Sequence, residues 1–452
     1  MQNKAKPRIL YLNYTSILTQ GILLSQVVIP MKKLAREGYR ITLVSGERIE
    51  DLQKRKQREA LHRDLEEAGV EIVFFRKTLK PYLRVDAKRG GHAIFRALCF
   101  VFDLVRLFLL TGTLIISRKC RIVHARSYVP ALIGLLYKYA LGIKLIFDPR
   151  GLLPEELIIA RGWSHSDWRF KTWKFLERIL LKHSNYVIAL SRPFKRHLFK
   201  IVPRKDIFIT PCCIDAERFT YDPQRRRDMR IRLGLGEHFT LVYSIGCFVP
   251  YQVFDEAMMV FDILREIKPD ARLLILTPEP DLIRQYSSKR ALNLENVSLT
   301  RAPFSKVPDY LMACDAGLLV RFPSIVSAVA SPVKFPEYLA CGLPVLSYKG
   351  IGDAELIIRR YSVGECMTPR DPESIKMAIR RIMALIEGYG DDLRSQCRSI
   401  ALRYFSWESY LPVYRKLYGN HNGEQSGKQR EEKKWNRSFI SIKIIFRLLL
   451  AE

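Results

Sequence analysis

The sequence predicts an α/β protein with two doubly wound parallel sheets in tandem, followed by C-terminal helices. At 452 residues the chain is too long for one hydrophobic core. Runs rich in valine, isoleucine and leucine alternate with helical stretches, as in parallel strands that are buried on both faces. The alternation is interrupted by a charged stretch at residues 222–239 and then begins again. We therefore expect two domains of this type.

Six strands are expected in the first domain, which we place at residues 1–205. A loop at residues 15–21 follows the first strand, and helical stretches separate most of the other strands. The strands are expected at residues 8–14, 40–46, 70–75, 120–127, 143–151 and 184–191.

The second domain is expected at residues 206–385. C-terminal helices at 386–420, which can cross back to the first domain, and a basic amphipathic tail at 421–452 follow it. Ligands of such sheets bind beyond the carboxyl ends of the strands, so site residues should directly follow strands. The strands of this domain are expected at residues 240–246, 271–277, 296–304, 316–322 and 343–350.

The charge of the chain favours anionic partners. It has 75 basic and 46 acidic residues, a net charge of +29, which suits phosphorylated ligands, an anionic membrane or nucleic acid. Nucleic acid is the less favoured partner, because no binding motif is present and the basic residues are spread along the chain. Nine cysteines without a Cys-x-x-Cys pair are expected to be small buried side chains in a reducing compartment. Residues 7–14 predict a strand rather than a signal peptide.

Two segments bear on membrane contact. Residues 93–116 are strongly apolar, but Arg96, Asp103 and Arg106 interrupt them on one side of a helix. The longest uncharged run there is shorter than the roughly 20 residues that span a bilayer, so we expect a core helix or an interfacial one. The tail, with its apolar run after Trp435, predicts a helix lying either on anionic lipid or on the protein's own surface.

The stretch "SPVKFPEYLACGLPV" predicts a short helix with an unusual charge pair. Ser331 is expected to cap a helix whose first residue is Pro332, although Pro336 can instead mark its start. Gly342 is expected to end it.

Lys334 and Glu337 lie on the same face of that helix. A lysine near a helix N-terminus suits a phosphate, whereas the carboxylate suits the hydroxyl groups of a ribose. The alternative is a solvated surface pair without a ligand.

The order of these segments resembles the family 4 glycosyltransferases, which have the GT-B fold. "SPVKFPEYLACGLPV" is similar to the family's "SP-x-K-x-x-EY-x-A-x-G-x-PV" signature, which contacts the nucleotide of a sugar nucleotide. "VHARSYVPALIGLLYKYALGIKLIFDPRG", "ITPCCIDAERF", "VPDYLMACDAGLL" and "GIGDAELI" resemble further family segments in the same order. The resemblance covers most of residues 8–385. It implies two Rossmann-like domains facing across a cleft, with the nucleotide sugar on the second.

Site residues follow from this resemblance. His124, Asp148 and Arg150 are the catalytic candidates on the acceptor side; alternatively, these strand-end residues hold loops together. Arg321 is added as a second cation for the diphosphate. The full set implied for the donor is Gly21, Gly246, Arg321, Ser331, Lys334, Glu337, Gly350, Gly352, Asp353 and Glu355.

The sequence also departs from the family pattern. Val329 stands where many members have a first glutamate, and Arg126 replaces the second histidine of a His-x-His pair. The basic pair common after the second domain's first strand is also absent, since Cys247 and Gln252 stand there. These departures leave room for an inactive relative.

The resemblance implies transfer of a sugar from a nucleotide-sugar donor to a lipid-linked or polysaccharide acceptor, with retention of configuration. No metal or other cofactor is expected, because no Asp-x-Asp-type pair follows a strand. Surface polysaccharide or glycolipid synthesis at the cytoplasmic face of the plasma membrane is the expected setting. The alternatives are a non-catalytic partner protein, a sugar-nucleotide epimerase, or a nucleic-acid binder, which the charge alone favours.

Overall fold

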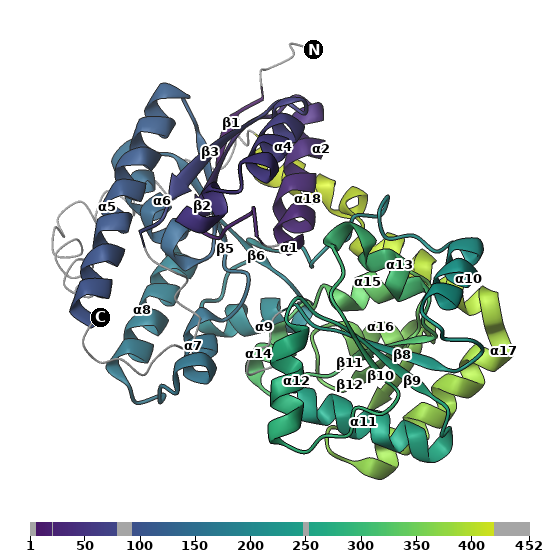
Figure 1. The fold of residues 1–452 in the computed structure, drawn as a ribbon. Helices are drawn as coiled ribbons and strands as arrows, with labels where there is room; N and C mark the ends of the chain where they lie inside the picture. The colour runs from purple at the N-terminus through teal and green to yellow at the C-terminus, as the bar shows by residue number, and fades with distance from the viewer. Residues whose placement is uncertain (1–5, 20, 79–92, 247–252, 420–452) are drawn as a thin grey trace. The chain divides into compact units, whose positions relative to one another are not determined.

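The computed structural model describes residues 6–19, 21–78, 93–246 and 253–419 of the chain. They form two compact units, and Figure 1 shows the elements of each. Unit 1 comprises Met1–Ile188, Arg204–Phe208 and Leu411–Glu452, and unit 2 comprises Ala189–Pro203 and Ile209–Tyr410. The tail expected at 421–452 lies outside the described residues, as do Cys247 and Gln252. The domain boundaries expected from the sequence stay predictions.

Unit 1 is built on a seven-stranded sheet in the order β3-β2-β1-β4-β5-β6-β7. The strand pairs from β3 to β6 are parallel, and Ile9 of the interior strand β1 lies opposite both Ile41 and Ile122. The six predicted strands are all present, and the three-residue β7 is an addition. The strands are β1 Arg8–Asn13, β2 Arg40–Glu47, β3 Val70–Arg76, β4 Ile122–Arg126, β5 Lys144–Asp148, β6 Tyr186–Ala189 and β7 Ile207–Ile209.

Helices cover both faces of this sheet. Parallel strands are joined by right-handed crossovers, so the helices after β3, β4 and β5 lie on the face opposite those after β1 and β2. Figure 1 shows α5, α6 and α8 side by side in one such layer. The helical elements are α1 Gly21–Leu23, the π-helix η1 Leu24–Val28, α2 Ile29–Arg36, α3 Ile49–Leu52, α4 Arg55–Glu66, α5 Ala93–Ser117, α6 Tyr128–Leu141, α7 Leu153–Arg161 and α8 Trp168–His183.

Helix α5 buries an aspartate and exposes large apolar side chains to solvent. Asp103 is buried and accepts hydrogen bonds from the backbone N–H and the hydroxyl of Thr78, at 2.8 and 2.7 Å. The exposed side carries leucine and phenylalanine instead. By length and composition alone, Leu98–Ser117 is apolar enough to cross a bilayer, contrary to the expectation from its uncharged run. Core helices of water-soluble proteins meet the same criterion, and a third of this stretch is buried.

Unit 2 contains a six-stranded parallel sheet in the order β10-β9-β8-β11-β12-β13. The five predicted strands are present, and β13 is an addition. The fold predicted from the sequence, with two parallel-sheet α/β domains, is thereby confirmed. The strands are β8 Thr240–Ser244, β9 Arg272–Leu276, β10 Val297–Thr300, β11 Ala316–Leu319, β12 Val345–Tyr348 and β13 Gly364–Met367.

Helices of unit 2 pack against this sheet. The last helix, α18, begins in unit 2 and continues into unit 1 at Leu411. The longest, α17, is kinked at Gly390, whose φ is +45°. The helical elements are α9 Arg192–Ile201, α10 Pro223–Arg232, α11 Phe254–Ile267, α12 Pro280–Lys289, the 3₁₀-helix η3 Phe304–Lys306, α13 Val307–Met312, α14 Ile325–Val329, α15 Lys334–Ala340, α16 Ala354–Tyr361, α17 Pro372–Phe405 and α18 Trp407–Tyr418.

The short helix α15 is fixed to the sheet by Tyr338. The tyrosine is fully buried, and its ring packs directly against Gly317 of β11. Its hydroxyl accepts a hydrogen bond from the N–H of Ser244 at 2.8 Å and donates one to the carbonyl of Leu318 at 3.3 Å. The side chain therefore ties α15 to the ends of β8 and β11.

A side chain at Gly317 should displace this tyrosine. In Gly317→Ala the new Cβ would lie 2.4 Å from Cδ2 of the Tyr338 ring, so we expect the free energy of unfolding to fall by about 1–3 kcal/mol. Urea denaturation measures it. The control is Gly388→Ala in α17, where no atom of the described residues lies within 4 Å of the new Cβ and stability should rise by about 0.5–1 kcal/mol. Equal effects of the two substitutions would contradict the packing argument.

Candidate functional site

The helix in the stretch "SPVKFPEYLACGLPV" begins later than the sequence predicts. Its first residue is Lys334, and Val333 occupies the N-cap position without a side-chain hydrogen bond. The predicted cap by Ser331 is wrong, because the Ser331 hydroxyl instead accepts a hydrogen bond from the N–H of Cys212 at 3.0 Å. The predicted end is confirmed: Gly342 has a φ of +74°, and the N–H of Leu343 returns to the carbonyl of Tyr338.

Lys334 and Glu337 form a partly buried ion pair. Lys334 Nζ lies 2.8 Å from Glu337 Oε2, and the glutamate is only 2% exposed. A solvated surface pair is therefore not what the chain forms at this position. A buried carboxylate needs partners that donate hydrogen bonds, and the hydroxyl groups of a sugar are donors of this kind.

The loop after β12 packs against the segment that leads into α15. Gly352 has a φ of +50°, and a Cβ there would lie 1.9 Å from the carbonyl oxygen of Ala330. Only glycine allows this approach. The N–H of Gly352 also donates to the carbonyl of Ser327 at 3.2 Å. The structure thus brings the predicted glycine loop and the predicted lysine–glutamate helix into one part of unit 2.

Glu355 supports the same loop. Its Oε2 accepts a hydrogen bond from the N–H of Gly350 at 3.0 Å, and its Oε1 lies 2.9 Å from Arg359. These two contacts occupy its carboxylate within the loop and helix α16.

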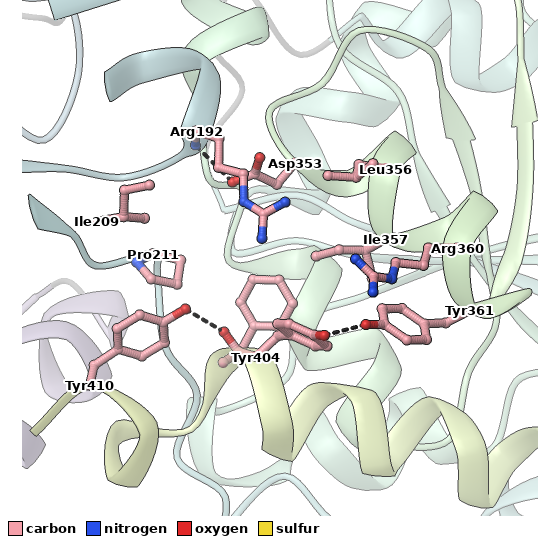
Figure 2. A pocket seen from close by; sticks show the side chains of 11 residues that line it. Arg192, Ile209, Pro211, Asp353, Leu356, Ile357, Arg360, Tyr361, Tyr404 and Tyr410 are labelled. Atoms are coloured by element: carbon pink, nitrogen blue, oxygen red, sulfur yellow. Dashed lines mark hydrogen bonds between the residues drawn. The ribbon is translucent and has the colours of Figure 1, made fainter. Parts of the chain in front are cut away.

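Asp353 lines a pocket of unit 2 that is shown in Figure 2. Its carboxylate accepts a hydrogen bond from the N–H of Arg192 at 3.0 Å, and burial raises its pKa. The pocket has a volume of about 70 Å³, and its lining includes Tyr361 and Tyr404, whose hydroxyls are hydrogen-bonded to each other. Of the predicted donor residues, only Asp353 lines this pocket.

Gly246 and Arg321 follow neighbouring strands. The order β8-β11-β12 places the ends of these three strands next to one another. Gly246, after β8, is exposed, and a Cβ on it would meet no atom of the described residues within 4 Å. Arg321, after β11, is half-buried near the Tyr243 hydroxyl. Within the described part of the chain, no atom fills the space beside Gly246 at the carboxyl edge of the sheet, where parallel sheets bind ligands.

The three candidates in unit 1 form a buried charged cluster. Asp148 Oδ2 lies 3.7 Å from both His124 Nε2 and Arg150 Nη1, and 3.8 Å from Arg126 Nη1. The other ring nitrogen of His124, Nδ1, lies 2.8 Å from the Tyr418 hydroxyl. The sequence did not predict roles for Arg126 or Tyr418, although Arg126 stands two residues after His124.

Burial and charge set the ionisation of this cluster. Burial lowers the pKa of His124 despite its neighbour Asp148. Burial alone would raise the pKa of Asp148, but the charge of Arg150, the contact with His124 and the charge of Arg126 together lower it. At neutral pH the cluster thus holds an aspartate anion, a neutral histidine and two cations. His124 is fully buried, so the more exposed arginines are the parts that a substrate can reach.

Gly21 begins helix α1 after a loop that two buried acids hold in place. Glu47, at the end of β2, accepts hydrogen bonds from the Ser45 hydroxyl and from the N–H of Ile17, and also contacts the hydroxyl of Ser16. The Ser16 hydroxyl lies 3.1 Å from Asp51. This support was not foreseen, because its partners are about thirty residues apart in the sequence.

Within the described residues, no group of three or more histidine, cysteine or acidic side chains is arranged to hold a metal ion.

Comparisons with known proteins agree with this architecture. The family model described as "Glycosyltransferase Family 4" matches residues 31–218, and the one described as "Glycosyl transferases group 1" matches residues 225–401. The chain is a glycosyltransferase family 4-like protein of the GT-B fold.

Solved structures and a curated protein resemble this family 4-like protein. The sucrose-phosphate synthase of Thermosynechococcus elongatus is 15% identical with a TM-score of 0.64, over 91% of this chain and 98% of that one. HepE of Anabaena, solved with UDP-glucose, is 14% identical with a TM-score of 0.62, over the same shares. A GDP-mannose-dependent phosphatidylinositol monomannoside mannosyltransferase of Mycolicibacterium smegmatis is 27% identical over 44% of this chain and 51% of its own. The chain spans about half the length of the curated relatives it matches.

The buried histidine makes the stability of this family 4-like protein depend on pH. Because the folded chain keeps His124 neutral, the unfolded chain alone takes up its proton below a pH of about 6.5. The free energy of unfolding should therefore fall on acidification by about 1 kcal/mol per pH unit more in the wild type than in His124→Gln. Urea titrations between pH 7 and pH 5 measure the slopes, with the surface substitution His62→Gln as control. Equal slopes for the wild type and His124→Gln would show that His124 ionises in the folded protein.

Proposed function

We propose that this chain transfers a sugar from a nucleotide-sugar donor to a lipid-linked or saccharide acceptor, with retention of configuration and without a metal ion. The observation that carries the proposal is the partly buried Lys334–Glu337 pair, beside a glycine loop that tolerates no side chain at Gly352. The family models support the reaction class. The UDP-glucose complex of HepE and the GDP-mannose dependence of the mycobacterial enzyme support a nucleotide sugar as donor.

Each residue of the donor site has a distinct role in the proposed reaction. Glu337 accepts hydrogen bonds from the ribose hydroxyls, and Lys334 neutralises the diphosphate as it leaves. Arg321 supplies a second positive charge, and Gly246 lets the phosphates approach the backbone. Glycosyl transfer is accelerated when these charges stabilise the departing diphosphate more strongly in the transition state than in the bound donor.

The acceptor is proposed from the chemistry of the surface. The net charge of +29 and the apolar helix α5 suit an acceptor held at an anionic membrane. We place the protein at the cytoplasmic face of the plasma membrane, in the synthesis of surface polysaccharide or glycolipid. The mycobacterial relative is named a phosphatidylinositol monomannoside mannosyltransferase, and this name supports a lipid acceptor.

A non-catalytic partner protein is the second candidate. The sequence favours it at Cys247 and Gln252, where the resemblance leads one to expect basic residues. The two candidates differ in turnover. An enzyme consumes the donor when a membrane extract supplies the acceptor, whereas a partner protein does not.

Removing either charge of the pair should weaken donor binding. We expect Lys334→Ala and Glu337→Gln each to lower the affinity for the preferred nucleotide sugar by about tenfold or more, since each breaks a charge-assisted contact worth about 1.5–3 kcal/mol. Calorimetry against a panel of UDP-, GDP- and ADP-sugars measures it. Arg284→Ala removes the cation of an exposed pair with the same three-residue spacing and serves as the control. Wild-type affinity in both variants would rule out this donor site.

Gly246 offers a test that separates binding from folding. Among the residues that the structure describes, none has an atom within 4 Å of a Cβ placed there, so Gly246→Ala should leave the melting temperature unchanged. If phosphates approach the backbone there, the side chain should weaken donor binding by about tenfold or more, as steric exclusion from a packed contact does. Thermal unfolding and calorimetry on the same sample measure both quantities. Unchanged donor affinity would remove Gly246 from the site.

A further inference from the structure

Helices α5, α6 and α8 of unit 1 expose large apolar side chains. On α5 they recur with a helical spacing that keeps them on one side, and two of them, Leu109 and Ile116, are 60% and 68% exposed. Helices α6 and α8 add aromatic and aliphatic residues. The exposed apolar residues of this layer are Leu98, Phe102, Val105, Leu109, Ile116, Tyr139, Leu141, Trp168 and Phe175.

The three helices form one layer rather than separate surfaces. Phe108 of α5 stacks on Tyr137 of α6, with ring centroids 4.7 Å apart, and the Tyr137 hydroxyl donates to the Phe108 carbonyl at 2.8 Å. Lys138 of α6 donates to the carbonyl of His183 at the end of α8, also at 2.8 Å. The exposed residues named above therefore belong to a continuous helix layer, which we call the helix-layer face.

Exposed charges on this layer are positive. In sequence the three helices contain only two acidic residues, Asp103 and Glu177, and both are buried. Asp103 is bonded to Thr78, and Glu177 contacts Lys174 and the hydroxyl of Tyr128. The exposed bases of α8 fall on the same stripe as its exposed aromatics, at the spacing 168, 171, 175, 178 and 182. They are Lys171, Arg178 and Lys182.

We propose that the helix-layer face is the surface with which this protein lies on an anionic lipid bilayer. Apolar side chains flanked by lysine and arginine, with a tryptophan and a phenylalanine on the same stripe, fit the boundary between lipid headgroups and acyl chains. This inference deepens the membrane contact in the proposed function and rests on it. It assigns that contact to named residues of α5, α6 and α8.

Charge complementarity favours lipid over a second copy of the chain. If two copies met through this face, the bases of each would find no exposed acidic side chain on the partner's three helices. An anionic leaflet, by contrast, attracts every exposed lysine and arginine of the face. Large apolar side chains exposed on three neighbouring helices are also uncommon on a surface that faces only water.

Vesicle flotation with the purified full-length protein tests the proposal. The wild type should bind vesicles of phosphatidylcholine mixed with phosphatidylglycerol and bind pure phosphatidylcholine much less. Phe102→Ser/Leu109→Ser should reduce binding to the mixed vesicles by about tenfold or more, because two apolar anchors are lost. Lys171→Glu/Arg178→Glu/Lys182→Glu should reduce it at least as much and should lessen its dependence on salt.

Matched variants control for general changes in charge and hydrophobicity. Ile231→Ser replaces the 80% exposed isoleucine of α10, and Arg380→Glu/Arg381→Glu reverses two exposed bases of α17. Both should bind like the wild type. Circular dichroism and thermal unfolding establish that every variant is folded, which surface positions should allow.

Three results would overturn the proposal. The wild type fails to bind the mixed vesicles; both helix-layer variants bind as well as the wild type; or Phe102→Ser/Leu109→Ser leaves vesicle binding intact while sedimentation without lipid shows a dimer becoming a monomer. Donor binding measured without vesicles separates this proposal from the proposed function. Loss of vesicle binding with donor affinity intact supports the lipid contact, whereas a wild type that binds vesicles but no nucleotide sugar refutes only the proposed reaction.

Discussion

The position of helix α15 depends on one tyrosine and one glycine. A seven-residue helix is too short to be stable alone, so tertiary packing must decide where it lies. Tyr338 supplies that packing, because its ring fills the space left by the missing side chain of Gly317 and its hydroxyl joins two strands. Glu337 precedes Tyr338 directly, and Lys334 lies one turn earlier. The proposed donor contacts are thus held by a residue that contacts no donor.

Unit 1 meets a different constraint, the burial of charge. Asp148, Arg126 and Arg150 are largely removed from water, and such groups often contribute less to stability than well-packed apolar side chains of the same volume. Stability alone is therefore a weak reason for their presence. Perturbed ionisation of this kind is frequent at functional sites, and these residues stand at the carboxyl ends of β4 and β5. The arrangement suits a rigid, positively charged surface more readily than a proton acceptor at His124.

The predictable parts of the molecule are those that local sequence determines. Apolar runs located eleven strands, because a parallel strand buried on both faces needs little help from distant residues to be recognised. The missed strands β7 and β13 are three and four residues long, and β13 has the sequence Gly-Glu-Cys-Met, which is not an apolar run. Ser331 shows the same limit in the site: its hydroxyl bonds to Cys212, 119 residues away, and no local capping rule can detect that contact.

Helix α5 shows why a charge pattern does not by itself reveal which side of a helix faces water. A side that carries an aspartate is normally expected to be solvated, yet Asp103 is buried because Thr78 offers both of its donors. Because that side of the helix faces the core, the leucine and phenylalanine residues on the opposite side face solvent. Burial of the opposite side would have left Asp103 solvated and hidden the stripe. One satisfied carboxylate thus determines that unit 1 presents an apolar, positively charged face.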